Sequence, residues 1–299
     1  MDGTYTQDQD SMQEDREFRI DIGDIELSVV EWLGEGDPIL LLHATGFHSR
    51  CWYEVVKDLP GRHIYAVDLR FHGKSGDAGE VAWKVMAEDI RILVEQLELS
   101  NILGVGHSIG GHLLTRVAAQ RPDLFQRLVL IDPVIQSPER YEFFREHLSD
   151  LGAADHPVSK RKNNWRDAEE MFERFKGKEP FSTWRPEVLR DYCDYALSPA
   201  GDDDFQTLAC DPINEAGIYM HQDGNEDILA MLPTIETPTL LLRAPPQEGD
   251  VPTFAASPTW PELAGILPNC KELYLPEHNH FIPMQDPELV ARVIRGDAT

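Results

Sequence analysis

Basic residues are scarce in this chain. Its 299 residues include 27 Lys and Arg against 53 Asp and Glu, which gives a formal net charge of −26 at pH 7. A charge of this sign repels phosphate backbones and anionic headgroups, so we expect neither nucleic acid nor an anionic membrane as a partner. A solvated acidic surface is the simplest explanation of the excess, and adaptation to a salty environment is a second one.

Cysteine is also rare, and long apolar runs are missing. The four cysteines are scattered and fit neither a metal site nor a disulfide framework, which predicts buried thiols in a reducing, cytoplasmic compartment: Cys51, Cys193, Cys210 and Cys270. No run reaches the length of a membrane span, and the N-terminal segment lacks the basic flank and apolar core of a signal peptide. Residues 1–15 are polar and acidic, and we expect a disordered tail there.

The chain does contain enough apolar residues, 41%, for one large α/β domain with an insertion or for two small domains. Buried-strand patterns alternate with helical patterns in residues 16–133 and again in residues 233–299. This alternation predicts a mostly parallel sheet flanked by helices. Residues 134–232 carry helical patterns rich in aromatic residues and no strand pattern, with Asn164 as the expected cap of a helix over 165–175. We therefore predict one α/β domain with an inserted helical cap over 134–232.

A Gly-x-Ser-x-Gly motif joins a short apolar run to one of the helical patterns. It reads Gly106-His107-Ser108-Ile109-Gly110 and predicts a nucleophile elbow, a sharp turn from strand to helix. Glycines are needed on both sides of the serine because strand and helix pass closely there. Such a turn exposes the Ser108 hydroxyl at the end of the strand and aims the Ile109 amide at a developing oxyanion. Taken alone, the motif also fits a phosphate-binding turn or simple packing.

With this motif, four segments of the chain resemble the α/β-hydrolase fold superfamily, in its serine esterase-like branch with a helical cap. They are residues 43–47 (His-Ala-Thr-Gly-Phe), the turn at 68–75, the elbow at 106–110, and Asn279-His280-Phe281 with Pro287-Glu288. The resemblance covers the chain from about residue 18 to its end. It implies a catalytic triad in the chain order nucleophile, acid, histidine.

The resemblance assigns the nucleophile to Ser108 and the base to His280, with His278 as the competing base. A serine hydroxyl is a poor nucleophile until a neutral imidazole removes its proton. The backbone N–H groups of Thr45 and Ile109 are the candidates for the oxyanion hole, and Phe47 is the substitute.

The acid is less clearly marked. The superfamily most often carries it after the strand that we predict at 237–243, but Gln247 stands there, with Glu248 and Asp250 nearby. Asp132 is our preferred candidate, because it follows the strand predicted at 127–131, where haloalkane dehalogenases and certain esterases of the superfamily carry their acid.

The resemblance implies a serine hydrolase that cleaves a carboxylic ester or a related acyl bond of a mostly apolar small molecule, with no cofactor and no metal. The negative protein field should disfavour polyanionic substrates. Carbon–carbon bond hydrolases, lactonases and cofactor-free perhydrolases use the same triad, and a non-catalytic ligand-binding protein of the same fold is a further alternative. No sequence feature predicts an oligomeric state.

Overall fold

The computed structural model describes residues 14–148, 150–200, 204–221, 224–247 and 253–297. Most of the predicted acidic tail, residues 1–13, lies outside these described residues. The predicted boundary at residue 15 is wrong, because Asp15 is already the first residue of strand β1 and pairs with Trp32. The sheet thus begins at the residue predicted to end the tail.

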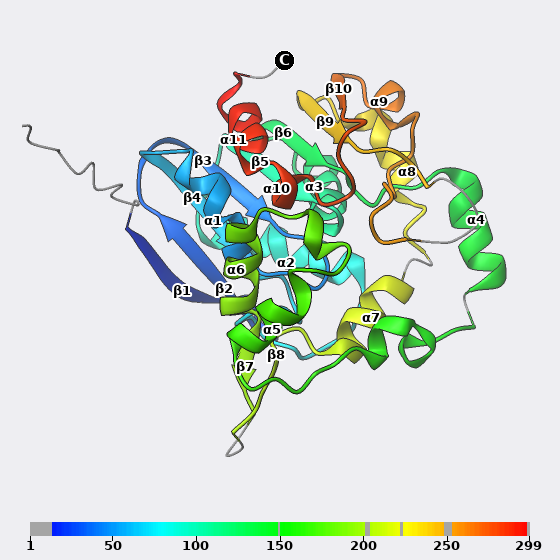
Figure 1. The fold of residues 1–299 in the computed structure, drawn as a ribbon. Coiled ribbons are helices and arrows are strands. Elements are labelled where there is room, and N and C mark those ends of the chain that lie inside the picture. Colours follow the sequence, from blue (N-terminus) through cyan, green and yellow to red (C-terminus); the bar gives the residue numbers. More distant parts are fainter. Residues whose placement is uncertain (1–13, 149, 201–203, 222–223, 248–252, 298–299) are drawn as a thin grey trace, which may run out of the picture.

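Eight strands of the described chain form one sheet in the order β1-β2-β4-β3-β5-β6-β9-β10 (Figure 1). β2 pairs antiparallel with β1 and β4, and every other neighbouring pair is parallel, which confirms the predicted mostly parallel sheet. The strands are β1 (Asp15–Asp21), β2 (Glu26–Trp32), β3 (Glu35–Leu42), β4 (Arg62–Val67), β5 (Ile102–His107), β6 (Phe125–Ile131), β9 (Thr239–Arg243) and β10 (Cys270–Tyr274).

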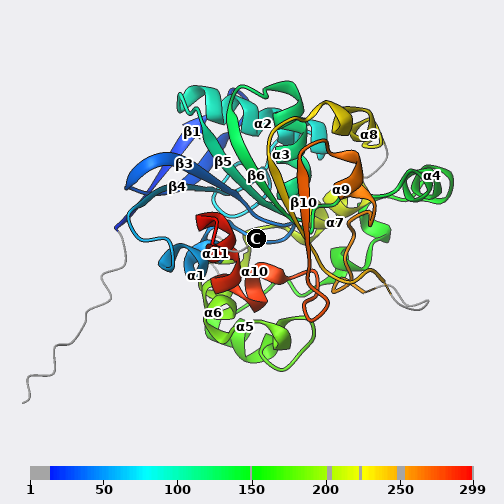
Figure 2. The same cartoon turned by 90° about the horizontal axis from the view of Figure 1, so that it is seen from above.

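Helices cover both faces of this sheet. Seen from above, α2 and α3 lie on one face, and α1 and α11 lie on the other (Figure 2). The described α-helices outside the segment between β6 and β9 are α1 (Tyr53–Lys57), α2 (Trp83–Gln96), α3 (Ile109–Gln120), α9 (Leu263–Ile266), α10 (Ile282–Gln285) and α11 (Pro287–Arg295). No helix among the described residues has both the length and the apolar character needed to cross a membrane.

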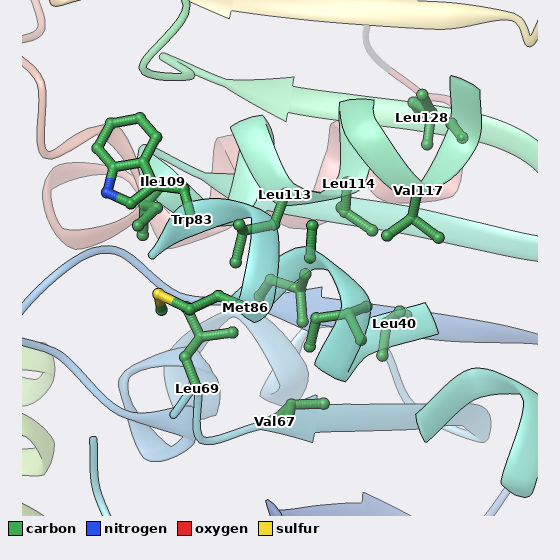
Figure 3. Packing of buried hydrophobic residues seen from close by; sticks show 14 of the residues in the cluster. Leu40, Val67, Leu69, Trp83, Met86, Ile109, Leu113, Leu114, Val117 and Leu128 are labelled. Carbon is green, nitrogen blue, oxygen red and sulfur yellow. The ribbon is translucent and has the colours of Figure 1, made fainter. Parts of the chain in front are cut away.

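The alternation of side chains along β3 explains why both faces need a cover. Leu40 and Leu42 belong to the core under α2 and α3, whereas Ile39 and Leu41 belong to the core under α1 and α11. All four side chains are fully buried, and burying each one stabilises the fold by about 1.5–3 kcal/mol. In the first core, Met86 of α2 and Leu113 of α3 belong to the same apolar cluster as the strand residues Leu40 and Val67 (Figure 3). A continuous apolar run is therefore what a strand covered on both faces requires.

The segment between β6 and β9 is mostly helical. Its α-helices are α4 (Pro138–His147), α5 (Ala168–Phe175), α6 (Pro186–Tyr195), α7 (Pro212–Met220) and α8 (Ile228–Met231). Helices α5 and α7 lie below the sheet in Figure 1. The expectation of a segment without strands is wrong, since β7 (Leu197–Pro199) and β8 (Gln206–Leu208) form an antiparallel pair there.

The start of α5 also differs from the prediction. Its first residue is Ala168, and the carboxylate of Asp167 accepts a hydrogen bond from the backbone N–H of Glu170 at 2.7 Å, so Asp167 rather than Asn164 caps the helix. Trp165 is extended instead and exchanges two backbone hydrogen bonds with Gln206, the first residue of β8. Tertiary pairing outweighs local helix propensity at this position.

Candidate active site

Ser108 occupies a strained turn between β5 and α3. It has φ 57° and ψ −118°, a conformation that is costly for a residue with a side chain. A Cβ atom on Gly106 would lie 2.5 Å from the carbonyl carbon of Gly110, and one on Gly110 would lie 2.4 Å from the carbonyl oxygen of Leu42. Both glycines of the motif are therefore required by close backbone approach, as the elbow interpretation predicts.

His280 reaches Ser108 from the loop between β10 and α10. Its Nε2 lies 3.0 Å from Ser108 Oγ, and its Nδ1 lies 2.7 Å from Asp132 Oδ2. The backbone of His280 is fixed on both sides, because its N–H donates to the Ala255 carbonyl at 2.8 Å and its carbonyl accepts from His107 Nε2 at 2.8 Å. The three predicted side chains thus meet in one hydrogen-bonded row.

Asp132 follows β6 and is fully buried. Its Oδ1 accepts hydrogen bonds from Ser257 Oγ at 2.6 Å, from Ala244 N at 3.0 Å and from Thr259 Oγ1 at 3.4 Å. A buried carboxylate is tolerable only with such donors. The sequence patterns missed Ser257 and Thr259, because they lie in a stretch without helical or strand periodicity.

The sequence also offered a competing base, His278, and two competing acids, Glu248 and Asp250. His278 Nε2 lies 3.6 Å from Asp286 Oδ2, whereas it is His280 Nε2 that lies at hydrogen-bond distance from Ser108 Oγ. Glu248 and Asp250, the alternative acids, lie outside the described residues. His280 and Asp132 are therefore the base and acid candidates that the geometry brings to Ser108.

The loop at residues 43–47 presents one candidate oxyanion donor. The Gly46 N–H donates to His72 Nε2 at 2.9 Å, and the Phe47 N–H donates to the Ala44 carbonyl at 3.2 Å. Within the part of the chain that the structure describes, no acceptor takes the N–H of Thr45 or of Ile109. Thr45 is thus better placed than Phe47 to donate to a substrate oxygen.

His72 fixes this loop as a neutral ring. Its Nε2 must be unprotonated to accept from Gly46, so its Nδ1 carries the proton and donates to the Arg70 carbonyl at 2.9 Å. Complete burial lowers the pKa of His72 to about 4, which agrees with the neutral form. Arg70 in turn is held by the carboxylates of Asp24 and Asp89. The turn at 68–75 therefore supports the loop rather than facing a substrate.

A cavity of about 900 Å³ opens in front of Ser108 and His280. This size lies in the range of small-molecule sites. The loop residue Phe47 contributes to its wall, and much of the remainder comes from the segment between β6 and β9. Aromatic side chains that line it include Trp165, Phe175, Phe181, Trp184, Tyr192 and Tyr219.

The described residues offer no grouping that suits a metal ion. Within residues 14–297, apart from the gaps stated above, no cluster of three His, Cys, Asp or Glu side chains has the arrangement that a metal needs. All four cysteines are free thiols, and only Cys270 is not fully buried. Burial raises the pKa of the Cys51 thiol, which keeps it protonated and unreactive.

The sequence matches the profile described as the alpha/beta hydrolase family over residues 39–293. The chain belongs to the alpha/beta hydrolase family. Among curated relatives, the hydrolase is 25% identical over 265 residues to the sn-1-specific diacylglycerol lipase ABHD11 of Danio rerio, which covers 87% of this chain and 77% of that protein. It is 31% identical over 117 residues to esterase Rv0045c of Mycobacterium tuberculosis, a match that covers 38% of this chain and 39% of the esterase.

Solved structures show the same fold. The hydrolase superposes on E-2-(acetamidomethylene)succinate hydrolase with a TM-score of 0.74 and 21% identity, covering 95% of this chain and 98% of the other. A thermophilic esterase of Thermogutta terrifontis gives a TM-score of 0.65 at 24% identity, with 94% and 97% covered. The predicted superfamily and fold class are thereby confirmed.

Proposed function

We propose that this alpha/beta hydrolase is a serine hydrolase that cleaves a carboxylic ester or a related acyl bond of a small molecule through an acyl-enzyme intermediate. The observation that carries the proposal is the hydrogen-bonded row from Ser108 through His280 to Asp132, which ends at the cavity. Relatives named lipase and esterase support the same class.

In this mechanism, His280 Nε2 removes the proton of Ser108 Oγ as the oxygen attacks the carbonyl carbon. The imidazolium then gives this proton to the leaving alcohol, and a water molecule repeats the sequence to release the acid. Asp132 accepts from His280 Nδ1, which keeps the proton-free nitrogen toward the serine. The three donors on the other oxygen of Asp132 hold the carboxylate in place for this role.

The tetrahedral intermediate carries a negative charge on the former carbonyl oxygen. In the proposed mechanism, the N–H groups of Thr45 and Ile109 donate to this oxygen. A single donor of this kind typically contributes about 3–4 kcal/mol of transition-state stabilisation. The first turn of α3 adds its dipole, because Ile109 is the first residue of that helix.

Residues 134–232 serve as the cap of residues 16–133 and 233–299 in this proposal. Cap side chains such as Trp184 and Tyr192 pack on Phe47 in an edge-to-face arrangement, with ring centroids 5.4 and 5.6 Å apart. The aromatic wall they form fits a mostly apolar substrate body. Substrate choice would then depend on the cap rather than on the triad.

The experiment that tests the proposal is hydrolysis of p-nitrophenyl butyrate by the wild type and by Ser108→Ala. We expect clear turnover by the wild type and a loss of at least about a thousandfold in Ser108→Ala. Ser100→Ala, which changes an exposed serine ahead of β5, is the matched control and should retain full activity. Equal activity of Ser108→Ala and the wild type would rule the proposal out.

A further inference from the structure

Positive charge collects in the wall of the cavity, in contrast to the rest of the chain. Among the described residues that line it, five are Lys or Arg and two are Asp or Glu. Over the whole chain, acidic residues outnumber basic ones by 53 to 27. A set of lining residues with the average composition of this chain would contain more acidic than basic residues. The excess of basic residues in the lining therefore indicates a function of the cavity.

Two of the five basic side chains are already neutralised. Arg161 Nη1 donates to Glu215 Oε2 at 2.6 Å, and its Nη2 donates to the hydroxyl of Tyr192 at 3.2 Å. Lys162 forms an ion pair with Glu170, and its ammonium lies 4.2 Å from the centroid of the Trp165 ring. These two groups help to build the wall and leave little net charge.

The other three have no acidic partner among the described residues. Arg140, Lys160 and Arg174 form no ion pair with any residue in the described ranges, although the guanidinium of Arg140 lies over the Phe143 and Phe144 rings at 5.2 and 4.9 Å. They come from three separate elements, α4, the short helix Pro157–Lys160 and α5. Asp155, the other acidic residue of the described lining, accepts a hydrogen bond from the Gly152 N–H and forms no ion pair among the described residues. Three unpaired cations therefore face one carboxylate, and the positive balance favours an anionic ligand.

From this arrangement we infer that the substrate carries a carboxylate, joined through an apolar body to the ester that is cleaved. The inference rests on the proposed function. The aromatic wall contacts the apolar body, and Arg140, Lys160 and Arg174 attract the carboxylate. A single negative charge fits better than a phosphate dianion, since the field of the strongly acidic chain opposes each additional charge. The acidic chain thus disfavours a ligand with more than one negative charge, and the basic cavity lining favours a ligand that is negatively rather than positively charged.

The test compares p-nitrophenyl hydrogen glutarate with its neutral methyl ester, two substrates that differ only in the distal group, which is a carboxylate in one and an uncharged methyl ester in the other. We expect the wild type to show a kcat/KM about tenfold higher for the anionic ester, as for one charge-assisted interaction. The ratio should fall stepwise in Lys160→Gln, Arg140→Gln and Arg174→Gln and approach one in the triple variant. Added salt should lower the wild-type ratio as well.

Lys178→Gln is the matched control, because Lys178 is an exposed lysine of the same segment that does not line the cavity. Its ratio should equal that of the wild type. All variants should keep the wild-type melting temperature, and Lys178→Gln should also hydrolyse the neutral ester at the wild-type rate, which separates loss of recognition from loss of folding. A wild-type ratio of one or below, or a ratio that the triple variant leaves unchanged, would overturn the inference while leaving the proposed serine chemistry intact.

Calorimetric titration of Ser108→Ala with the same two esters separates binding from turnover. We expect the anionic ester to bind about tenfold more tightly than the methyl ester, and this preference to vanish when the three cationic residues are also replaced. If the wild type hydrolyses neither ester, the proposed function fails and this titration alone decides whether the cavity selects a carboxylate. Equal binding of the two esters would refute that selection.

Discussion

His280 and Asp132 lie 148 positions apart in the sequence and are joined by a 2.7 Å hydrogen bond between Nδ1 and Oδ2. This bond fixes the proton on Nδ1 and leaves Nε2 free to face Ser108 Oγ at 3.0 Å. The opposite oxygen of Asp132 is held by donors from the loop after β9, so the acid after β6 is oriented by the region where related enzymes more often carry their acid.

The first prediction concerns the acid. Asp132→Asn replaces the acceptor of the Nδ1 proton with an amide and should reduce kcat for p-nitrophenyl butyrate by about ten-thousand-fold, since the imidazole can then adopt the wrong tautomer. Glu248→Gln and Asp250→Asn should keep most of the activity. A large loss in Asp250→Asn together with near-normal turnover by Asp132→Asn would reverse the assignment.

Ser257 should act as a positioning residue for that acid. Ser257→Ala removes the 2.6 Å hydrogen bond to Asp132 Oδ1, and a charge-assisted hydrogen bond of this kind is worth about 1.5–3 kcal/mol. We expect kcat to fall about tenfold or more at unchanged KM, as steady-state kinetics would show. Thr259→Val removes a longer, 3.4 Å contact and should have a smaller effect on kcat. An unchanged kcat in Ser257→Ala would show that the other donors suffice.

A substitution at Gly46 tests whether the loop at residues 43–47 contributes to catalysis. Its φ of +80° strains any residue with a Cβ, and that Cβ would lie 2.4 Å from Glu215 Oε1. Gly46→Ala should therefore lower both thermal stability and kcat. Gly36→Ala is the control, because Gly36 has a similar φ of +83° and nothing within 4 Å of the added Cβ. Gly36→Ala should lower the free energy of unfolding by about 1–2 kcal/mol through backbone strain alone and leave kcat unchanged. Equal kcat values in both variants would contradict the role of the loop.

Asp191 on α6 should make stability depend on pH. Burial, together with the nearby Glu54 carboxylate, raises the pKa of Asp191 from 3.8 to about 7. The folded state then holds a proton between these values that the unfolded state has released, so this group's contribution to stability is lost as the pH rises toward 7 and above. Asp191→Asn should gain stability relative to the wild type between pH 5 and pH 8.5, by at least about 1 kcal/mol.

Urea unfolding at the two pH values measures this difference. Asp77→Asn, at an exposed position, serves as the control and should shift stability by the same amount at both pH values. A constant difference between Asp191→Asn and the wild type would show that the carboxyl of Asp191 is not protonated in the folded protein at pH 5.

The parallel sheet and its elbow could be predicted from the sequence because each has a local signature. Continuous apolar runs such as 39–42 occur where helices cover both faces of a strand, and Gly106 and Gly110 mark a close backbone approach. The candidate acid could be placed after β6 for the same reason, since Asp132 ends such a run. The sequence pattern that marks each of these features lies within a few residues.

The remaining features depend on contacts between distant segments, which leave no local pattern. The extended Trp165 pairs with Gln206, 41 positions later, and so shortens a helix that local propensity would start earlier. Arg161 meets Glu215 inside the cavity, and Ser257 meets Asp132 in the core. None of these pairs shares a helix or strand. The unpaired cations of the cavity lining come from three separate elements, and none of these elements has a sequence pattern that predicts a binding site.

Covalent labelling of Ser108 tests the central claim most directly. A fluorophosphonate should add once to the wild type, and peptide mass spectrometry should place the adduct on the peptide that contains Ser108. We predict no adduct in Ser108→Ala and strongly slowed labelling in His280→Ala, because the hydroxyl then loses its base. A wild-type protein that stays unlabelled, or a Ser108→Ala variant labelled to the same extent, would contradict the proposed nucleophile.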